Sequence, residues 1–121
     1  KRFRNDVRYT RTGTLTTGCT YRLYINTVNN LGGATLIGTF TCTLNHQLAA
    51  FVSDYAFKSS NSIQRVSSTF SLATDEGVGG LALAITNFTF DSTIDNYLIF
   101  AAQEASAADT SLISYLTILK Y

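Results

Sequence analysis

The sequence predicts an all-β domain of eight antiparallel strands, and three observations support this prediction. Thr, Tyr, Phe, Val and Ile, which suit a pleated surface, dominate the chain. Apolar runs recur at a spacing of about 10–12 residues, with small polar clusters between them. The sequence shows no helical period and contains no Pro, so nothing demotes a run to a sheet edge. Such a pattern is typical of a sandwich or a barrel.

The amino-acid composition narrows the class of protein further. The 121 residues fit one domain, and the 45% apolar content is sufficient for a core. Only 14% of residues are charged, against about 25% in an ordinary soluble domain. The net charge of +1 argues against nucleic acid as a partner of the whole domain. The chain has no apolar run of 18 or more residues, so no membrane span is expected.

Residues 1–6 (KRFRND) are polar and basic and show no apolar period, which predicts an arm, a linker or a frayed terminus. Residues 7–121 are then a single β-sandwich domain, jelly-roll type. Its predicted strands are 7–17, 19–27, 34–45, 48–57, 63–73, 81–91, 96–103 and 110–120. The turns between them are rich in Asn, Gly, Ser and Asp, which favour the special conformations of tight turns.

The last two strands carry apolar side chains on both faces. In 96–103, alternation separates Tyr97, Ile99 and Ala101 from the residues between them. A strand of a solvated sheet would have polar residues on its outer face. We therefore expect self-association about a threefold axis, unless the arm or the 28–33 loop covers this surface. The predicted interface residues are Tyr97, Ile99, Ala101, Ile113 and Tyr115; in the last strand Leu112, Leu116 and Ile118 would face away from Ile113, Tyr115 and Leu119.

From GTLTTGCTYRLYINTVNNLGGATLIGTFTCT to LISYLTILKY, the sequence resembles the C-terminal tip or head domains of bacteriophage tail fibres and tailspikes. These are trimeric jelly rolls, similar in architecture to the C1q/TNF fold. The resemblance covers most of residues 12–121 and lies in strand order, Thr/Ser/Gly-rich turns and an apolar final strand. It implies a homotrimer on the virion surface, outside the cell, whose partner is a host cell-surface glycan or protein. Candidate receptor contacts lie in two predicted turns: Asn45, His46, Gln47, Lys58 and Asn61.

Nothing in the sequence predicts an enzyme, a cofactor or a metal site. His46 is the only histidine, and neither Cys19 nor Cys42 belongs to a C-x-x-C motif. The acids of segment 91–95 are too few for a calcium loop. Whether the two cysteines form a disulfide is left open.

Basic residues gather near the start of the chain, which supports an alternative. An Arg-rich tail ahead of a jelly roll is also how small capsid proteins hold nucleic acid. A capsid or other virion structural subunit is therefore the second hypothesis, and an extracellular filament or adhesin subunit the third. The clustered basic residues are Lys1, Arg2, Arg4, Arg8, Arg11 and Arg22, with Asp6 the only acid among them.

Overall fold

A computed structural model describes residues 2–42, 46–59, 62–73, 77–79, 86–89, 91 and 93–120. Within these residues the chain forms nine strands and no helix. No helix of the described segments is therefore long and apolar enough to cross a membrane. The strands are β1 (Arg2–Thr12), β2 (Cys19–Asn26), β3 (Thr35–Cys42), β4 (Leu48–Ser59), β5 (Ser62–Ala73), β6 (Gly77–Gly79), β7 (Thr86–Thr89), β8 (Tyr97–Glu104) and β9 (Thr110–Lys120).

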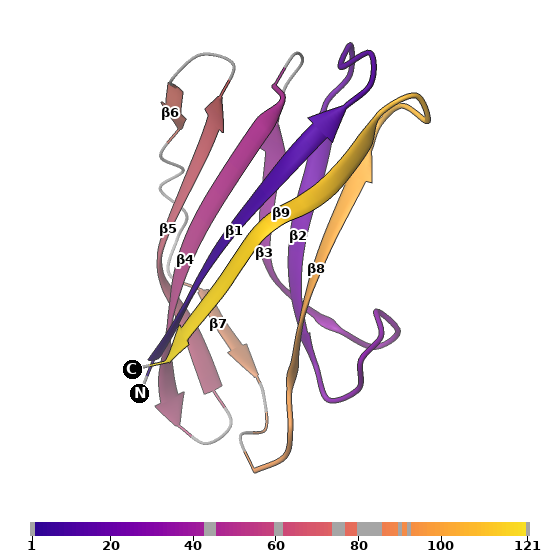
Figure 1. The fold of residues 1–121 in the computed structure, drawn as a ribbon. Helices are drawn as coiled ribbons and strands as arrows, with labels where there is room; N and C mark the ends of the chain where they lie inside the picture. Colours follow the sequence, from indigo (N-terminus) through magenta and orange to yellow (C-terminus); the bar gives the residue numbers. More distant parts are fainter. Residues whose placement is uncertain are drawn as a thin grey trace.

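The strands form two antiparallel sheets that pack face to face (Figure 1). The larger sheet has the order β6-β5-β4-β1-β9, with β7 also paired to β5, and the smaller sheet has the order β3-β2-β8. The first strand of the chain thus pairs with the last, and β2 pairs with β8. The all-β prediction with antiparallel sheets is confirmed, and the arrangement is sandwich-like.

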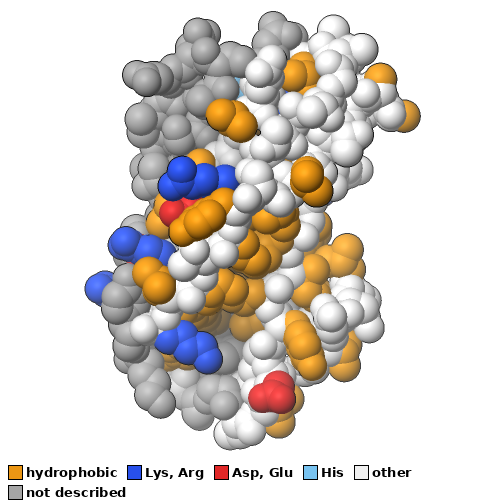
Figure 2. All heavy atoms as spheres, in the orientation of Figure 1, with side chains coloured by type: hydrophobic (Ala, Val, Ile, Leu, Met, Phe, Trp, Pro, Cys, Tyr) orange, Lys and Arg blue, Asp and Glu red, His pale blue; other side chains and the backbone are white. Residues whose placement is uncertain are grey.

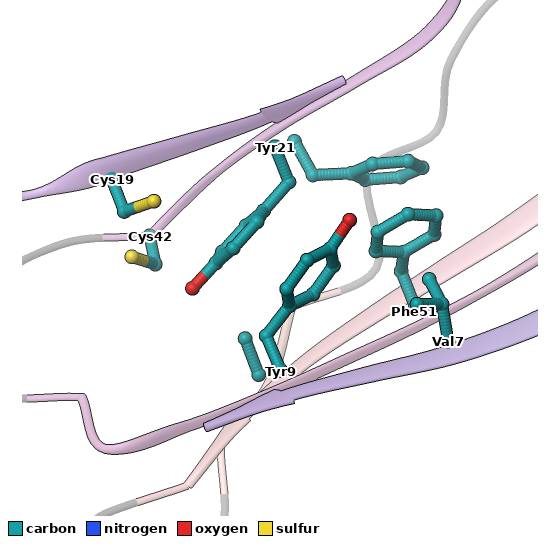
Figure 3. Packing of buried hydrophobic residues seen from close by; sticks show 8 residues of the cluster. Val7, Tyr9, Cys19, Tyr21, Cys42 and Phe51 are labelled. Carbon is teal, nitrogen blue, oxygen red and sulfur yellow. The ribbon is translucent and has the colours of Figure 1, made fainter. Parts of the chain in front are cut away.

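The core lies between the sheets because alternate residues of each strand point inward. Rings from the two sheets stack on each other there (Figure 3). Tyr9 of β1 lies on Tyr21 of β2 with ring centroids 4.1 Å apart, and Phe40 of β3 lies on Phe51 of β4 at 4.3 Å. Offset aromatic stacks of this kind add to the free energy gained by burying the rings.

Residues 2–6 belong to β1, and this differs from the predicted arm. They pair with β4 on one side and with β9 on the other. Phe3 and Asn5 are buried, and the Phe3 ring stacks on Tyr55 at 4.7 Å. The inward residues of β1 alternate correctly, but Asn5 and Arg11 are polar. Because Asn5 is polar, residues 2–6 show no apolar alternation although they belong to the strand.

The other predicted strands differ mainly at their ends. The ranges 19–27, 48–57, 63–73, 96–103 and 110–120 correspond to β2, β4, β5, β8 and β9. The range 7–17 was too long at its C-terminal end, since β1 ends at Thr12. The range 34–45 corresponds to β3, which runs from Thr35 to Cys42, and 43–45 lie outside the described residues. Most of the predicted strand 81–91 lies outside the described residues, which contain β7 from this range. The short β6 falls between the predicted strands 63–73 and 81–91.

Candidate functional site

The side of the molecule bordered by β8 and β9 is open. Each of these strands is the outermost of its sheet, and no described strand pairs with its outer edge. β8 and β9 are joined at one end and diverge toward the other (Figure 1). In the same orientation, Figure 2 shows hydrophobic side chains gathered around a hollow where the two strands separate. We call this region the open side, bordered by β8 and β9.

On β8 the register separates two faces. Leu98 and Phe100 lie opposite Ile25 and Leu23, which are buried, so this face points into the core. Residues directly opposite each other in an antiparallel pair share one face of the sheet. The alternate residues Tyr97, Ile99 and Ala101 therefore lie together on the outer face of the smaller sheet, as the sequence predicted. We call these three residues the β8 patch.

On β9 a β-bulge reverses the predicted faces. Arg8 pairs with Tyr115, but the next residue, Tyr9, pairs with Ile113, so Ser114 is the extra residue. Because Tyr9 is buried, Ile113 lies on the inner face, whereas Tyr115 lies on the outer face. The Arg8 guanidinium confirms this, since it lies 5.4 Å from the centre of the Tyr115 ring. The expectation that Ile113 and Tyr115 share a face is wrong, because one inserted residue shifts the alternation.

Both faces of β9 are exposed. Its outer face carries Leu112, Tyr115 and Leu119, which we call the β9 stripe, and its inner face carries Ile113, Leu116 and Ile118. All six are more than a third exposed, and Leu112 reaches 68%. A strand with apolar residues on both faces has the composition of a covered, central strand. Here that composition stands at the edge of a sheet, and Thr110–Leu119 carries no charge to deter pairing.

The predicted interface residues are therefore not brought together on one surface. Tyr97, Ile99 and Ala101 lie on the outside of the smaller sheet, Tyr115 on the outside of the larger sheet, and Ile113 between the sheets. All of them still border the open side.

The predicted receptor contacts lie at two opposite ends of the larger sheet. His46 and Gln47 lie beside the end of β1, where the Arg11 amide donates to the Gln47 carbonyl at 2.7 Å. Lys58 lies beyond the other end of β1, because Arg2 pairs with Ala56. Gln47 and Lys58 are exposed and His46 is partly buried. Asn45 and Asn61 lie outside the described residues.

A polar cluster closes the end of the sandwich where β1 ends and β2 begins. Arg11 is fully buried there, and its guanidinium donates to both carboxylate oxygens of Glu104, at 2.9 and 2.7 Å. It also donates to the carbonyls of Thr17 at 2.8 Å and His46 at 3.1 Å. Ser111 donates to Glu104, and Asp109 lies 3.9 Å from the guanidinium. We call Arg11, Glu104, Asp109 and Ser111 the closed-end cluster.

The ionisation of this cluster suits a structural role. Burial alone would raise the pKa of Glu104, but hydrogen bonds from Arg11 and Ser111 outweigh it and lower that pKa. The amide of Leu15, with the Thr14 side chain, lowers the pKa of Asp109. Both carboxylates thus remain charged acceptors, which is not the state of a general acid. Among the residues that the structure describes, no group of His, Cys, Asp and Glu could hold a metal ion.

Sequence reasoning missed this cluster, because its members come from distant segments. Arg11 and Glu104 are 93 positions apart. The one available signal was the position of Arg11 in an alternating strand, in phase with Val7 and Tyr9.

The fold and the open side define an all-β, sandwich-like protein whose exposed apolar surface lies along two edge strands. Comparison of the chain with protein-family models, with curated proteins and with solved structures gives no match.

Proposed function

We propose that the chain is a non-enzymatic assembly domain that forms a homotrimer through its open side. The observation that carries this proposal is β9, which exposes apolar side chains on both faces and has no described partner on its outer edge. Apolar surface of this extent on a protein marks an interaction site. The biological setting we propose is the tip of a viral fibre or spike, at the virion surface, with a host cell-surface glycan or protein as its partner.

The placement of the apolar residues favours a contact between two different surfaces over a self-complementary one. In a threefold ring each contact is heterologous: one surface of a copy meets a different surface of the next copy. The β8 patch and the β9 stripe lie on opposite outer faces of the sandwich, and both border the open side. A twofold dimer would need only one self-complementary surface. Two distinct apolar surfaces therefore support a heterologous contact between the β9 stripe of one copy and the β8 patch of the next, and we propose that this contact closes into a ring of three copies.

The strand pairing supports the jelly-roll part of the proposal. β1 pairs with β9 and β2 pairs with β8, while β4 and β5 form a hairpin between them in the sequence. Nested pairing of this kind is what a long hairpin gives when it folds over into two sheets. The tail-fibre tip domains that the sequence resembles have this type of fold.

The alternative of a capsid subunit loses its main support. It depended on a free basic arm, but Arg2 and Arg4 lie within β1. The Arg4 guanidinium donates to both carboxylate oxygens of Asp54, each at 2.9 Å. We therefore propose no second function.

Mass in solution tests the assembly. We expect sedimentation velocity at micromolar concentration to give a trimer, and a stable monomer would refute the proposal. Tyr97→Asp places a charge in the β8 patch and Tyr115→Asp places a charge in the β9 stripe, so each variant alone should be monomeric. Leu31→Asp places the same charge at an exposed apolar position outside both surfaces and should remain a trimer.

A mixture of the two variants tests the heterologous contact. The Tyr97→Asp chain keeps its β9 stripe and the Tyr115→Asp chain keeps its β8 patch, so one intact contact can form between them. We expect a one-to-one heterodimer in the mixture. Monomers alone would show that the two surfaces do not meet.

Binding to a glycan array and to intact bacterial cells tests the receptor part separately. The candidate contacts lie at two ends of the larger sheet, so variants at the two ends should differ in binding. One variant replaces both His46 and Gln47 by Ala, and the other is Lys58→Ala. We expect only one of them to lose binding. A trimer that binds neither probe would refute the receptor role and leave the assembly role standing.

A further inference from the structure

Cys19 and Cys42 face each other across two strands. Cys19 is the first residue of β2, Cys42 is the last residue of β3, and they are directly paired in the register. Both are free thiols and both are buried. Figure 3 shows their side chains next to each other at the edge of the aromatic cluster. Directly opposed residues of an antiparallel pair have Cα atoms about 4.5–5.5 Å apart, which lies within the range of about 4.4–6.8 Å that a disulfide requires.

The surroundings of the pair make the two thiols unequal. The Cys19 thiol stabilises the thiolate of Cys42, burial opposes this, and the charge of Arg11 supports it; together they lower the pKa of Cys42. The same contact and burial raise the pKa of Cys19. Ser111 also lies near the pair, with its hydroxyl oxygen 3.6 Å from the Cys19 sulfur. Cys42 is therefore the better nucleophile and Cys19 the thiol that reacts second.

We propose that Cys19 and Cys42 are a redox modification site, which a small-molecule disulfide such as oxidised glutathione converts into an intramolecular disulfide between β2 and β3. Both residues stand at strand ends, so the reagent needs only local opening of this terminal pair. The lateral bond would hold the end of the smaller sheet that contributes Glu104 to the closed-end cluster.

The chemistry proceeds in two exchanges. The Cys42 thiolate attacks one sulfur of oxidised glutathione, and the first glutathione leaves as a thiolate. Cys19 then loses its proton and attacks the Cys42 sulfur of the mixed disulfide, which expels the second glutathione. Two cysteine thiols are oxidised, one external disulfide is reduced, and the two protons end on the two glutathione molecules.

The test is thiol trapping of the native protein. The chain is incubated with oxidised glutathione, quenched in acid, then unfolded and alkylated with iodoacetamide. We expect an intact mass two hydrogens below that of the reduced chain, no alkylation, and a linked peptide containing Cys19 and Cys42. A parallel incubation in urea shows that the reagent is active. Two alkylated cysteines after native incubation, or a disulfide between two chains, would overturn the proposal.

Single variants test the order of the two steps. Cys19→Ser should stop at a glutathione adduct on Cys42, whereas Cys42→Ser should acquire far less adduct on Cys19. Equal adduct levels in the two variants would refute the assigned roles. Circular dichroism establishes that each variant is folded, and the thermal midpoint of the oxidised wild type should exceed that of the reduced form. An unchanged midpoint would refute the proposed bracing of the sheet.

Discussion

The Arg11 guanidinium donates two hydrogen bonds to the Glu104 carboxylate, from Nε to Oε1 at 2.9 Å and from Nη2 to Oε2 at 2.7 Å. Arg11 belongs to β1 of the larger sheet and Glu104 to β8 of the smaller one, so this ion pair joins the two sheets. Bidentate pairing is among the strongest arrangements available to a carboxylate. At the same end, the Ala105 amide donates to the Gly18 carbonyl at 3.1 Å, which ties the start of β2 to the end of β8.

Removal of Arg11 should be strongly destabilising. Arg11→Met removes the ion-pair partner of Glu104 and the guanidinium hydrogen bonds to two backbone carbonyls in a buried site. We expect the free energy of unfolding in urea to fall by about 3–5 kcal/mol. The matched control is Arg22→Met, since Arg22 makes a single exposed hydrogen bond to Gln103 and should cost less than about 1 kcal/mol. If the two variants lose equal free energy of unfolding, the buried pair of Arg11 and Glu104 contributes no more to stability than an exposed hydrogen bond.

Acid should weaken the fold through Glu104 and Asp109. The pKa of each is lowered in the folded chain, so each carboxylate holds a proton less tightly than in the unfolded chain. This contribution to stability is present above the unfolded pKa values of about 4.3 and 3.9. It is lost as the pH falls through the lower folded values. We therefore expect the free energy of unfolding to be level from pH 7 to about 5 and to decline below about pH 4.

Asp109→Asn tests the source of this decline. Asn cannot be protonated in this range, so the variant should start less stable at pH 7 and lose less between pH 5 and pH 3. Urea unfolding at each pH gives the free energy of unfolding at pH 7 and its loss between pH 5 and pH 3. A variant that declines as steeply as the wild type would assign the acid sensitivity to other carboxylates.

Gly13 allows the loop after β1 to approach the turn before β9. Its φ of +127° lies in a region that side chains rarely adopt. A Cβ at this position would contact the Ala108 carbonyl and would lie 2.6 Å from Oδ1 of Asp109. Gly13→Ala should cost about 1–3 kcal/mol or more, because conformational strain and a backbone clash add together.

Gly33→Ala is the control for Gly13. Gly33 also has a positive φ, of +74°, but among the described residues other than its two chain neighbours, no atom lies within 4 Å of the position that a Cβ would take there. Its substitution should cost about 1 kcal/mol from strain alone. If the thermal midpoints of the two variants fall equally, the close approach at Gly13 adds nothing to the cost of its substitution.

The sequence was sufficient to predict the class of fold and most of the strands, because period-two alternation follows directly from strand geometry. The faces of β8 were also predictable, since its pairing with β2 runs without a shift. The predicted faces failed where a bulge inserts one residue. Ser114 reverses the alternation in β9. The same thing happens in β3, where strict alternation from Phe40 would place Leu36 inward, but a shift between Leu23 and Tyr24 leaves Leu36 exposed and Ile37 buried. Bulges depend on the partner strand, which a single strand does not reveal.

The closed-end cluster was beyond prediction for a different reason. Arg11, Asp109 and Glu104 are of types that are usually exposed, and they can be withdrawn from water here because Arg11 lies beside both carboxylates. Their meeting depends on the pairing of β1 with β9 and of β2 with β8. Such long-range pairings follow from the packing of the whole chain and not from any local pattern.

Replacement of Asn5 by an apolar residue should stabilise the folded chain. Its side chain is fully buried, pairs across the sheet with Ser53 and Ile118, and has no hydrogen-bond partner among the described residues. Burial of an unsatisfied amide costs about 1–3 kcal/mol in proteins. We expect Asn5→Val to raise the free energy of unfolding by about 1–2 kcal/mol, since Val also suits a strand.

The control for Asn5 is an asparagine whose amide is satisfied. The Asn26 amide donates to the carbonyls of Asn30 at 2.8 Å and Gly32 at 3.1 Å, so Asn26→Val should cost about 1–2 kcal/mol. Ser53→Ala removes the neighbouring unsatisfied hydroxyl without adding volume and should be neutral or stabilising. If Asn5→Val and Ser53→Ala both lower stability as Asn26→Val does, the buried pair has hydrogen-bond partners in solution. In that case a bound water inside the sandwich would be the group that satisfies them.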